Sequence, residues 1–234
     1  MADSTLTTVV VIAHNYGRFL REAVLSVVGQ TTPPRIVVID DASTDDTPEV
    51  AQSLCAAHPQ IEHQRLAHNI GLSRVRNRAA DLVTTEWIVY LDADDWLDAS
   101  YVERAEAWLR RSPDVDVLTT DMTIVRAERA PRVFRSRVPR FWDDLLERNT
   151  IVQTSFIRRA MIQRLGGYDP ALDFEDWDFW IRLLQSGGRV ARLPGSHVYR
   201  REHGQNKSKL CDEAAATAAV LTKHRGRPRT TVVP

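Results

Sequence analysis

Short apolar runs alternate with amphipathic stretches over the N-terminal half of the chain, and this alternation restricts it to a few folds. The run TTVVVIA at 7–13 is continuous and rich in β-branched residues, which is typical of a strand covered on both faces. Similar runs follow at RIVVID (35–40), at the weaker IEHQRL (61–66) and at EWIVYL (86–91). Because helical patterns separate these runs, the order is βαβαβαβ. The sequence therefore predicts the α/β class, with a mostly parallel, Rossmann-like sheet flanked by helices.

Three amphipathic helices are expected between these runs. The Gly and Pro residues of SVVGQTTPP end the first helix, and Ser43 and Asp46 have the spacing of a capping box at the start of the second. Each helix presents one apolar face to the sheet. The apolar residues are Leu20, Ala23, Val24, Val27 and Val28 in the first helix, Val50, Ala51 and Leu54 in the second, and Leu72, Val75, Ala79 and Leu82 in the third.

The composition argues against several classes of protein. The 234 residues contain 31 Lys and Arg against 31 Asp and Glu, so no net charge attracts nucleic acid. No stretch is apolar enough to span a bilayer, and MADSTLTTVV lacks the regions of a signal peptide. Cys55 and Cys211 show neither metal-ligand spacing nor a disulfide framework. We expect a cytoplasmic protein whose tail, RGRPRTTVVP (225–234), is disordered.

Polar clusters follow three of the predicted strands: AHNYG (13–17), DDAS (40–43) and DADDW (92–96). An isolated pair of aspartates is most often a solvated turn. However, ligands of parallel α/β sheets bind outside the carboxyl ends of the strands, where these clusters should meet. AHNYG has one glycine, which argues against the G-x-G-x-x-G turn of a dinucleotide-binding Rossmann domain. Several carboxylates at one edge instead predict a divalent cation, Mn²⁺ or Mg²⁺, bridged to substrate phosphates.

Segments between about residues 8 and 203 resemble, in order, the motifs of family 2 glycosyltransferases, which have the GT-A fold. They are VVVIAHNYGRFLREAVLSVVGQT, IVVIDDASTDDT, HNIGLSRVRNRA, VYLDADDW and GGYDPALDFEDWDFWIRLLQSGG. The resemblance implies a nucleotide-sugar donor, a divalent cation and an inverting transfer to an acceptor. It also implies a nucleotide-sugar-binding half, which we place at 1–115, and a smaller acceptor-binding half of the same domain, at 116–224.

The resemblance implies roles for residues of the first half. Asp41 resembles the aspartate that accepts the imide N–H of uracil or thymine, so the donor is a UDP- or dTDP-sugar. His14 either contacts the base or is a packed aromatic substitute, and Arg76 either contacts the ligand or is the structural partner of a site carboxylate. The donor-binding residues implied are Ala13, His14, Asn15, Asp41, Asn69, Arg76 and Asp92.

For the metal, the resemblance implies Asp94 as a ligand, Asp95 as an assisting carboxylate and His203 as a third group that approaches once donor binds. An extra residue near His203 separates this sequence from the family's pattern, and His197 is expected in a strand.

A helix is predicted to begin near Glu175, with Trp177, Ile181 and Leu184 at core spacing. Acidic residues in a first turn often only complement the helix dipole. The stretch nevertheless resembles the family's E-D-x-x-x-W motif, which implies Asp176 as the catalytic base and Glu175 as the alternative. An aspartate at a helix N-terminus is expected to stay ionised at neutral pH.

The acceptor is the least determined part of the sequence. The stretch VRAERAPRVFRSRVPRFW (125–142) carries six arginines. It either faces a phosphorylated, lipid-linked or otherwise anionic acceptor, with peripheral membrane contact, or is a solvated flexible segment. Glycans and small molecules remain alternative acceptors. Two other functions are open: a sugar-nucleotide nucleotidyltransferase, which should carry a Gly-rich basic loop after the first strand, and a catalytically silent sugar-binding module.

Overall fold

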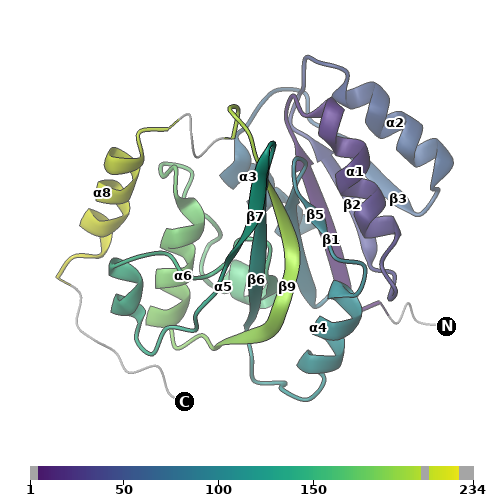
Figure 1. Cartoon of the computed structure of the whole chain (residues 1–234). Helices are drawn as coiled ribbons and strands as arrows, with labels where there is room; N and C mark the ends of the chain where they lie inside the picture. The colour runs from purple at the N-terminus through teal and green to yellow at the C-terminus, as the bar shows by residue number, and fades with distance from the viewer. Residues whose placement is uncertain (1–4, 207–210, 227–234) are drawn as a thin grey trace.

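A computed structural model describes residues 5–206 and 211–226, which form a single mixed sheet flanked by helices (Figure 1). Strands β1 (Thr7–Ala13), β2 (Arg35–Asp40), β3 (Ile61–Arg65) and β4 (Trp87–Asp92) pair in parallel in the order β3-β2-β1-β4. The four predicted strands and their parallel arrangement are confirmed. The α/β class is confirmed with them.

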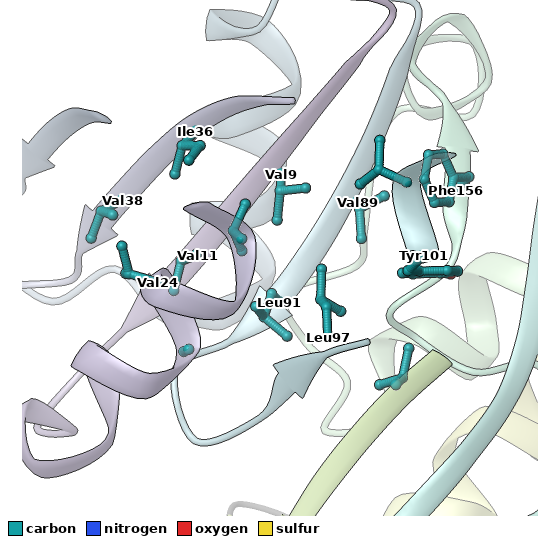
Figure 2. Packing of buried hydrophobic residues seen from close by; sticks show 14 of the residues in the cluster. Val9, Val11, Val24, Ile36, Val38, Val89, Leu91, Leu97, Tyr101 and Phe156 are labelled. Carbon is teal, nitrogen blue, oxygen red and sulfur yellow. The ribbon is translucent and has the colours of Figure 1, made fainter. Parts of the chain in front are cut away.

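The helices of this half cover both faces of the sheet. They are α1 (Gly17–Val28), α2 (Thr47–Ala57) and α3 (Leu72–Leu82). Because side chains alternate along a strand, Val9 and Val11 of β1 pack in the cluster that contains Val24 of α1 (Figure 2). Val10 instead packs in the second cluster, with Val75 of α3. Each valine that is fully buried in this way stabilises the fold by about 1.5–3 kcal/mol, which explains the unbroken apolar run in β1.

The rest of the chain extends the same sheet. Beyond β4 the order is β8-β6-β9-β5, and β7 pairs with β6. The strands are β5 (Trp96–Leu97), β6 (Val117–Arg126), β7 (Arg129–Phe134), β8 (Phe156–Arg158) and β9 (Val190–Glu202). The helices are α4 (Tyr101–Leu109), the 3-10 helix η1 (Trp142–Leu146), α5 (Arg159–Arg164), α6 (Glu175–Gln185) and α8 (Glu213–His224). The predicted helix start at Glu175 and the strand at His197 are confirmed.

The predicted capping box of the second helix is wrong. The N-cap of α2 is Asp46, which makes no side-chain capping bond. The first turn is held instead by Asp45, whose Oδ1 accepts a hydrogen bond from Thr47 N at 3.0 Å. Ser43 Oγ accepts from Asn15 N of the neighbouring loop at 2.9 Å. The spacing of Ser43 and Asp46 is that of a capping box. The Ser43 hydroxyl nevertheless bonds the loop after β1 and does not cap α2.

The single glycine of AHNYG has a packing role. A Cβ on Gly17 would lie 2.0 Å from Asp46 Oδ1, at the point where the start of α1 meets the start of α2. Gly17 N also donates to Asp45 Oδ2 at 3.1 Å. The glycine therefore permits close approach of two helix N-termini.

The first part of the arginine-rich stretch, up to Phe134, forms the β6–β7 hairpin, and Arg135, Arg137 and Arg140 lie outside helices and strands. Strands β6 and β7 pair antiparallel, with Met122 opposite Phe134 and Ile124 opposite Arg132. Backbone pairing orders this stretch although most side chains of β7 are exposed. The predicted disordered tail lies almost wholly in 227–234, outside the described residues.

The C-terminal helix α8 is fastened to α6 by a buried carboxylate. Asp178 is fully buried and contacts His224 Nε2 at 2.8 Å, Lys223 Nζ at 2.8 Å and Arg182 Nε at 2.7 Å. Burial alone raises the pKa of Asp178, but these hydrogen bonds and the Arg182 charge hold it well below its usual range. In the part of the chain that the structure describes, no helix is long and apolar enough to cross a bilayer.

Candidate active site

The carboxyl ends of β1, β2 and β4 open into a cleft of about 1010 Å³. This is the edge at which α/β sheets bind ligands, and the volume is large for a small-molecule site. The strand ends, the loop before α3 and the first turn of α6 all contribute to its wall, so the prediction that the polar clusters meet at one edge is confirmed. The predicted residues that line the cleft are His14, Asn15, Asp41, Asn69, Arg76, Asp92, Asp94, Asp95, Glu175 and Asp176.

Ala13 differs from its neighbours in AHNYG. Its side chain is 1% exposed and packs in the core, because it lies on the face of β1 that meets α1. Its carbonyl oxygen accepts a hydrogen bond from Asp41 N at 2.9 Å. Only the backbone of Ala13 can therefore border a ligand, whereas the side chains of His14 and Asn15 line the cleft.

The loops after β1 and β2 are tied to each other and to the loop before α3. Asn15, in the left-handed region with φ 59°, accepts from Thr44 N at 2.8 Å through Oδ1. His14 Nδ1 lies 2.8 Å from Asp41 O. The Asp41 carboxylate accepts from Ile70 N at 2.8 Å and from Gly71 N at 2.9 Å. Each carboxylate oxygen has two lone pairs, so Asp41 can still accept a hydrogen bond from a ligand.

The carboxylates of DADD have separate environments. The Asp92 side chain is 42% exposed and pairs with Arg76 Nη2 at 3.2 Å. Asp94 is buried, and its Oδ2 lies 3.0 Å from His203 Nε2 and accepts from Asn206 Nδ2 at 2.9 Å. Asp95 is also buried, and its Oδ1 accepts from Arg201 N at 3.0 Å. Asp94 and His203, distant in sequence, thus lie side by side.

Negative charge is concentrated around Asp94. Burial and the Asp92 charge raise its pKa, and burial with the charges of Asp94 and Asp92 raises the pKa of Asp95 well above its usual range. Burial, followed by the charges of Asp94 and Asp92, raises the pKa of Tyr16 to about 12. A cation at this position would stabilise the ionised carboxylates.

The donor set fits a hard divalent cation that is completed by substrate. Among residues 5–206 and 211–226, no group of three or more His, Cys, Asp and Glu side chains is arranged to hold a metal ion. Asp94 and His203 offer one carboxylate and one imidazole side by side. Mg²⁺ is commonly held by one or two carboxylates together with substrate phosphates, and imidazole also suits transition metals. The Asp95 carboxylate accepts a hydrogen bond from the β9 backbone at Arg201 N.

Arg76 joins the two acidic motifs. Its guanidinium is 2% exposed and contacts Asp92 through Nη2 and Glu175 through Nη1. Glu175 is itself 3% exposed. Arg76 is thus a partner of two site carboxylates, and it also lines the cleft. The contact engages the carboxylate of Glu175 in a buried ion pair.

Asp176, the next residue, has a different environment. Burial and the Glu175 charge raise its pKa to about 6, against the lowering effects of Arg76 and of a hydrogen bond from Asn149. Asn149 Nδ2 donates to Asp176 Oδ2 at 3.1 Å. The helix N-terminus does not keep this pKa at its ordinary value because burial outweighs it. With a pKa of about 6, Asp176 is still mostly ionised at pH 7, as expected.

Several residues of the site were not assigned a role from the sequence. Asn149 lies in a loop with no motif, and Asn206 was not singled out for its contact with Asp94. Tyr16 follows the AHN triplet, and its OH donates to Gln205 O at 3.0 Å. The ring of Phe19 lies 5.0 Å from that of His203, so α1 packs against the turn that carries this histidine.

Comparison with known proteins identifies the family. The sequence profile described as glycosyl transferase family 2 matches residues 8–165. A glycosyltransferase of Mycobacterium tuberculosis in PGL/p-HBAD biosynthesis is 30% identical over 163 residues, 67% of this chain and 60% of the relative. An uncharacterised M. tuberculosis protein is 30% identical over 212 residues, 84% of this chain. This chain spans 59% of the length of that relative.

Solved structures share the fold. S. aureus TarS 1–349 in complex with UDP-GlcNAc superimposes with a TM-score of 0.74 at 21% identity, covering 88% of this chain and 61% of TarS 1–349. The mannosyltransferase PcManGT from Pyrobaculum calidifontis, in complex with GDP-Man and Mn²⁺, gives a TM-score of 0.71 at 20% identity, with 95% and 66% coverage. Both likenesses support the GT-A fold. Because the family profile matches more than half of the sequence, this chain belongs to glycosyl transferase family 2.

Proposed function

We propose that the protein is an inverting glycosyltransferase that moves a sugar from a UDP- or dTDP-sugar to an acceptor hydroxyl or amine. One observation carries the proposal: the DADD carboxylates and the Asp176 carboxylate line the same cleft, while Arg76 takes up the carboxylate between them, Glu175. A metal-assisted leaving group and a separate base are the two elements of a single displacement. We place donor binding in 1–115 and acceptor binding in 116–224.

The donor assignment is supported by relatives and by one residue. TarS has been solved with UDP-GlcNAc and PcManGT with GDP-Man, so both neighbours bind nucleotide sugars. Within this chain, Asp41 is a hydrogen-bond acceptor at the cleft and would accept the imide N–H that uracil and thymine share. We also propose a cytoplasmic location, where cysteines such as Cys55 and Cys211 stay reduced.

Mn²⁺ or Mg²⁺ would be held by Asp94, with His203 beside it and the donor diphosphate completing the coordination. When bound, the ion neutralises negative charge on the departing diphosphate. Asp92 would contact the ribose or donor sugar, Asp95 would orient Asp94, and Asn69 would border the nucleotide.

Asp176 is proposed as the base that takes the acceptor proton. Its carboxylate is oriented by Asn149 and lines the cleft. Glu175 is the poorer candidate because Arg76 already binds it in a buried ion pair. General bases act best when their pKa lies near the working pH, and a value of about 6 agrees with that requirement.

A thermal-shift screen tests the donor assignment. We expect UDP or dTDP to raise the melting temperature, and Mn²⁺ to increase that shift, because ligands that bind only the native state stabilise it. GDP serves as the matched diphosphate control and should give a smaller shift. No stabilisation by any nucleoside diphosphate with Mn²⁺ would contradict the function. Stabilisation by nucleoside triphosphates alone would favour a nucleotidyltransferase, and stabilisation by free sugars alone would favour a silent sugar-binding module.

The stereochemistry of the product tests the single displacement. A retaining double displacement needs a protein nucleophile at the reacting carbon, whereas here the one carboxylate proposed to act freely is assigned to proton removal. We expect an α-linked nucleotide sugar of the gluco or galacto series to give a β-linked product. The anomeric proton coupling of the purified product should be large. A small coupling, or a sugar trapped on the protein, would overturn this mechanism.

A further inference from the structure

The β6–β7 hairpin presents one mixed apolar and cationic face to the cleft. Met122 and Ile124 of β6 and Phe134 of β7 all line it, and so does Arg132. Residues paired across strands project from the same face of a sheet. Since Met122 pairs with Phe134 and Ile124 pairs with Arg132, these four side chains form one surface.

Two more arginines border this surface. Arg200 of β9 is paired with Ile124 on the side opposite Arg132, so the two arginines flank one apolar residue across three strands. The guanidinium of Arg148 lies 5.7 Å from the centre of the Phe134 ring. All three arginines line the cleft. We call Arg132, Arg148 and Arg200 the arginine wall.

Within the arginine wall, Arg148 lies on the base side of the cleft. Arg148 directly precedes Asn149, whose side chain donates to Asp176. The same segment is anchored to α6, because Trp177 Nε1 donates to Leu145 O at 2.7 Å. A group bound by Arg148 therefore lies near the proposed base.

Arg132 and Arg148 are available to a ligand. Both are exposed, and within residues 5–206 and 211–226 neither forms an ion pair with a carboxylate. The cleft wall also carries carboxylates, but no ion pair between them and Arg132 or Arg148 occurs in the described residues. The planar guanidinium binds phosphate and carboxylate groups in a bidentate manner.

We propose that the arginine wall binds an acidic acceptor: a saccharide that carries a phosphate or carboxylate group. The anionic group contacts Arg132 and Arg148, and the apolar face of the sugar ring packs on Phe134, Met122 and Ile124. This places an acceptor hydroxyl toward Asp176. The inference rests on the proposed glycosyl transfer, because only that function makes the bound saccharide an acceptor. Binding at the arginine wall can still be tested without measuring transfer.

Calorimetric titration with glucose, glucose 6-phosphate and glucuronic acid tests the site, because these probes differ only at C6. The titrations are run with and without UDP and Mn²⁺, so that an occupied donor site no longer competes for the phosphate. The test variant is Arg132→Ala with Arg148→Ala. The matched control is Arg129→Ala with Arg135→Ala, which removes the same charge from exposed positions outside the cleft wall. Melting curves of both variants report folding.

We expect the anionic sugars to bind at least about tenfold more tightly than glucose, since hydrogen bonds to charged groups are stronger than neutral ones. That preference should disappear in the Arg132/Arg148 variant and persist in the control. Comparison of the affinities for glucose 6-phosphate and glucuronic acid reports whether the site prefers a phosphate or a carboxylate. Equal affinities for all three sugars, no binding of either anionic sugar, or equal losses in the two variants would overturn the proposal. So would displacement of glucose 6-phosphate by UDP with Mn²⁺, because the arginines would then hold the donor.

The outcomes separate this site from the proposed function. A protein that prefers anionic sugars but transfers no sugar from any nucleotide donor keeps the site and loses the function. A protein that transfers sugar to neutral acceptors, with no loss in the Arg132/Arg148 variant, keeps the function and loses the site.

Discussion

Replacement of Asp176 by asparagine is expected to slow the chemical step of sugar transfer by about 10²–10⁴-fold, the usual contribution of a positioned general base. Asparagine keeps the shape of the side chain and its contact with Asn149 but removes the basic carboxylate. Donor affinity should stay almost unchanged, because Asp176 acts on the acceptor. Single-turnover rates measure the chemical step, and calorimetric titration of the donor nucleotide measures affinity.

The matched control is Glu175→Gln, at the adjacent and more buried acid. It weakens the buried ion pair with Arg76, so we expect a lower melting temperature and a smaller loss of rate than in Asp176→Asn. A larger rate loss in Glu175→Gln than in Asp176→Asn, at temperatures where both remain folded, would make Glu175 the base.

The pH dependence of the wild-type rate gives a second measure of the same base. Its pKa of about 6 reflects burial, the Glu175 charge, and the opposing effects of Arg76 and Asn149; Tyr168 also faces it. A base works when deprotonated, so the rate should fall as the pH is lowered through about 6. The Asp176→Asn variant should lose this acid limb. If the decrease in rate at low pH persists unchanged in this variant, the titrating group is not Asp176.

Replacement of Asp94 by alanine is expected to abolish transfer and the Mn²⁺-dependent part of nucleotide binding. Asp94 is the carboxylate that contacts both His203 and Asn206, so its loss removes the proposed metal ligand. Nucleotide binding without Mn²⁺ should remain, because the hydrogen bonds that hold Asp41 and Asn15 do not involve Asp94. Thermal shift with UDP, measured with and without Mn²⁺, separates these two parts of the binding.

Asp94→Asn is the control for folding. Asp94 is buried, so alanine also removes two buried contacts. Asparagine preserves the shape while removing one charge from a crowded acidic cluster, and it should fold at least as well as wild type. Full transfer activity in EDTA, or in the Asp94→Asn variant, would rule out the proposed metal role.

Local patterns in the sequence were sufficient for the nucleotide-binding half of the fold. The strands at 7–13 and 35–40 have the observed bounds, because burial on both faces requires an unbroken apolar run. The strand order then places the ends of these strands beside Asp92, so the cleft itself was predictable from topology. These features depend on residues two to four positions apart, whose spacing is visible in the sequence.

Other features depend on partners that are distant in the chain, and only the tertiary structure decided them. The motif leaves both Asp176 and Glu175 as candidates for the base, and their partners differ: Arg76, 99 residues before Glu175, pairs with Glu175, whereas Asn149 bonds Asp176. The Ser43 hydroxyl bonds Asn15 in place of its own helix, and the first part of the arginine-rich stretch forms a strand because β6 supplies its backbone partners. Periodicity records which face of a segment is buried. It does not record which distant group meets that face, because that contact forms only when the sheet and its helices pack.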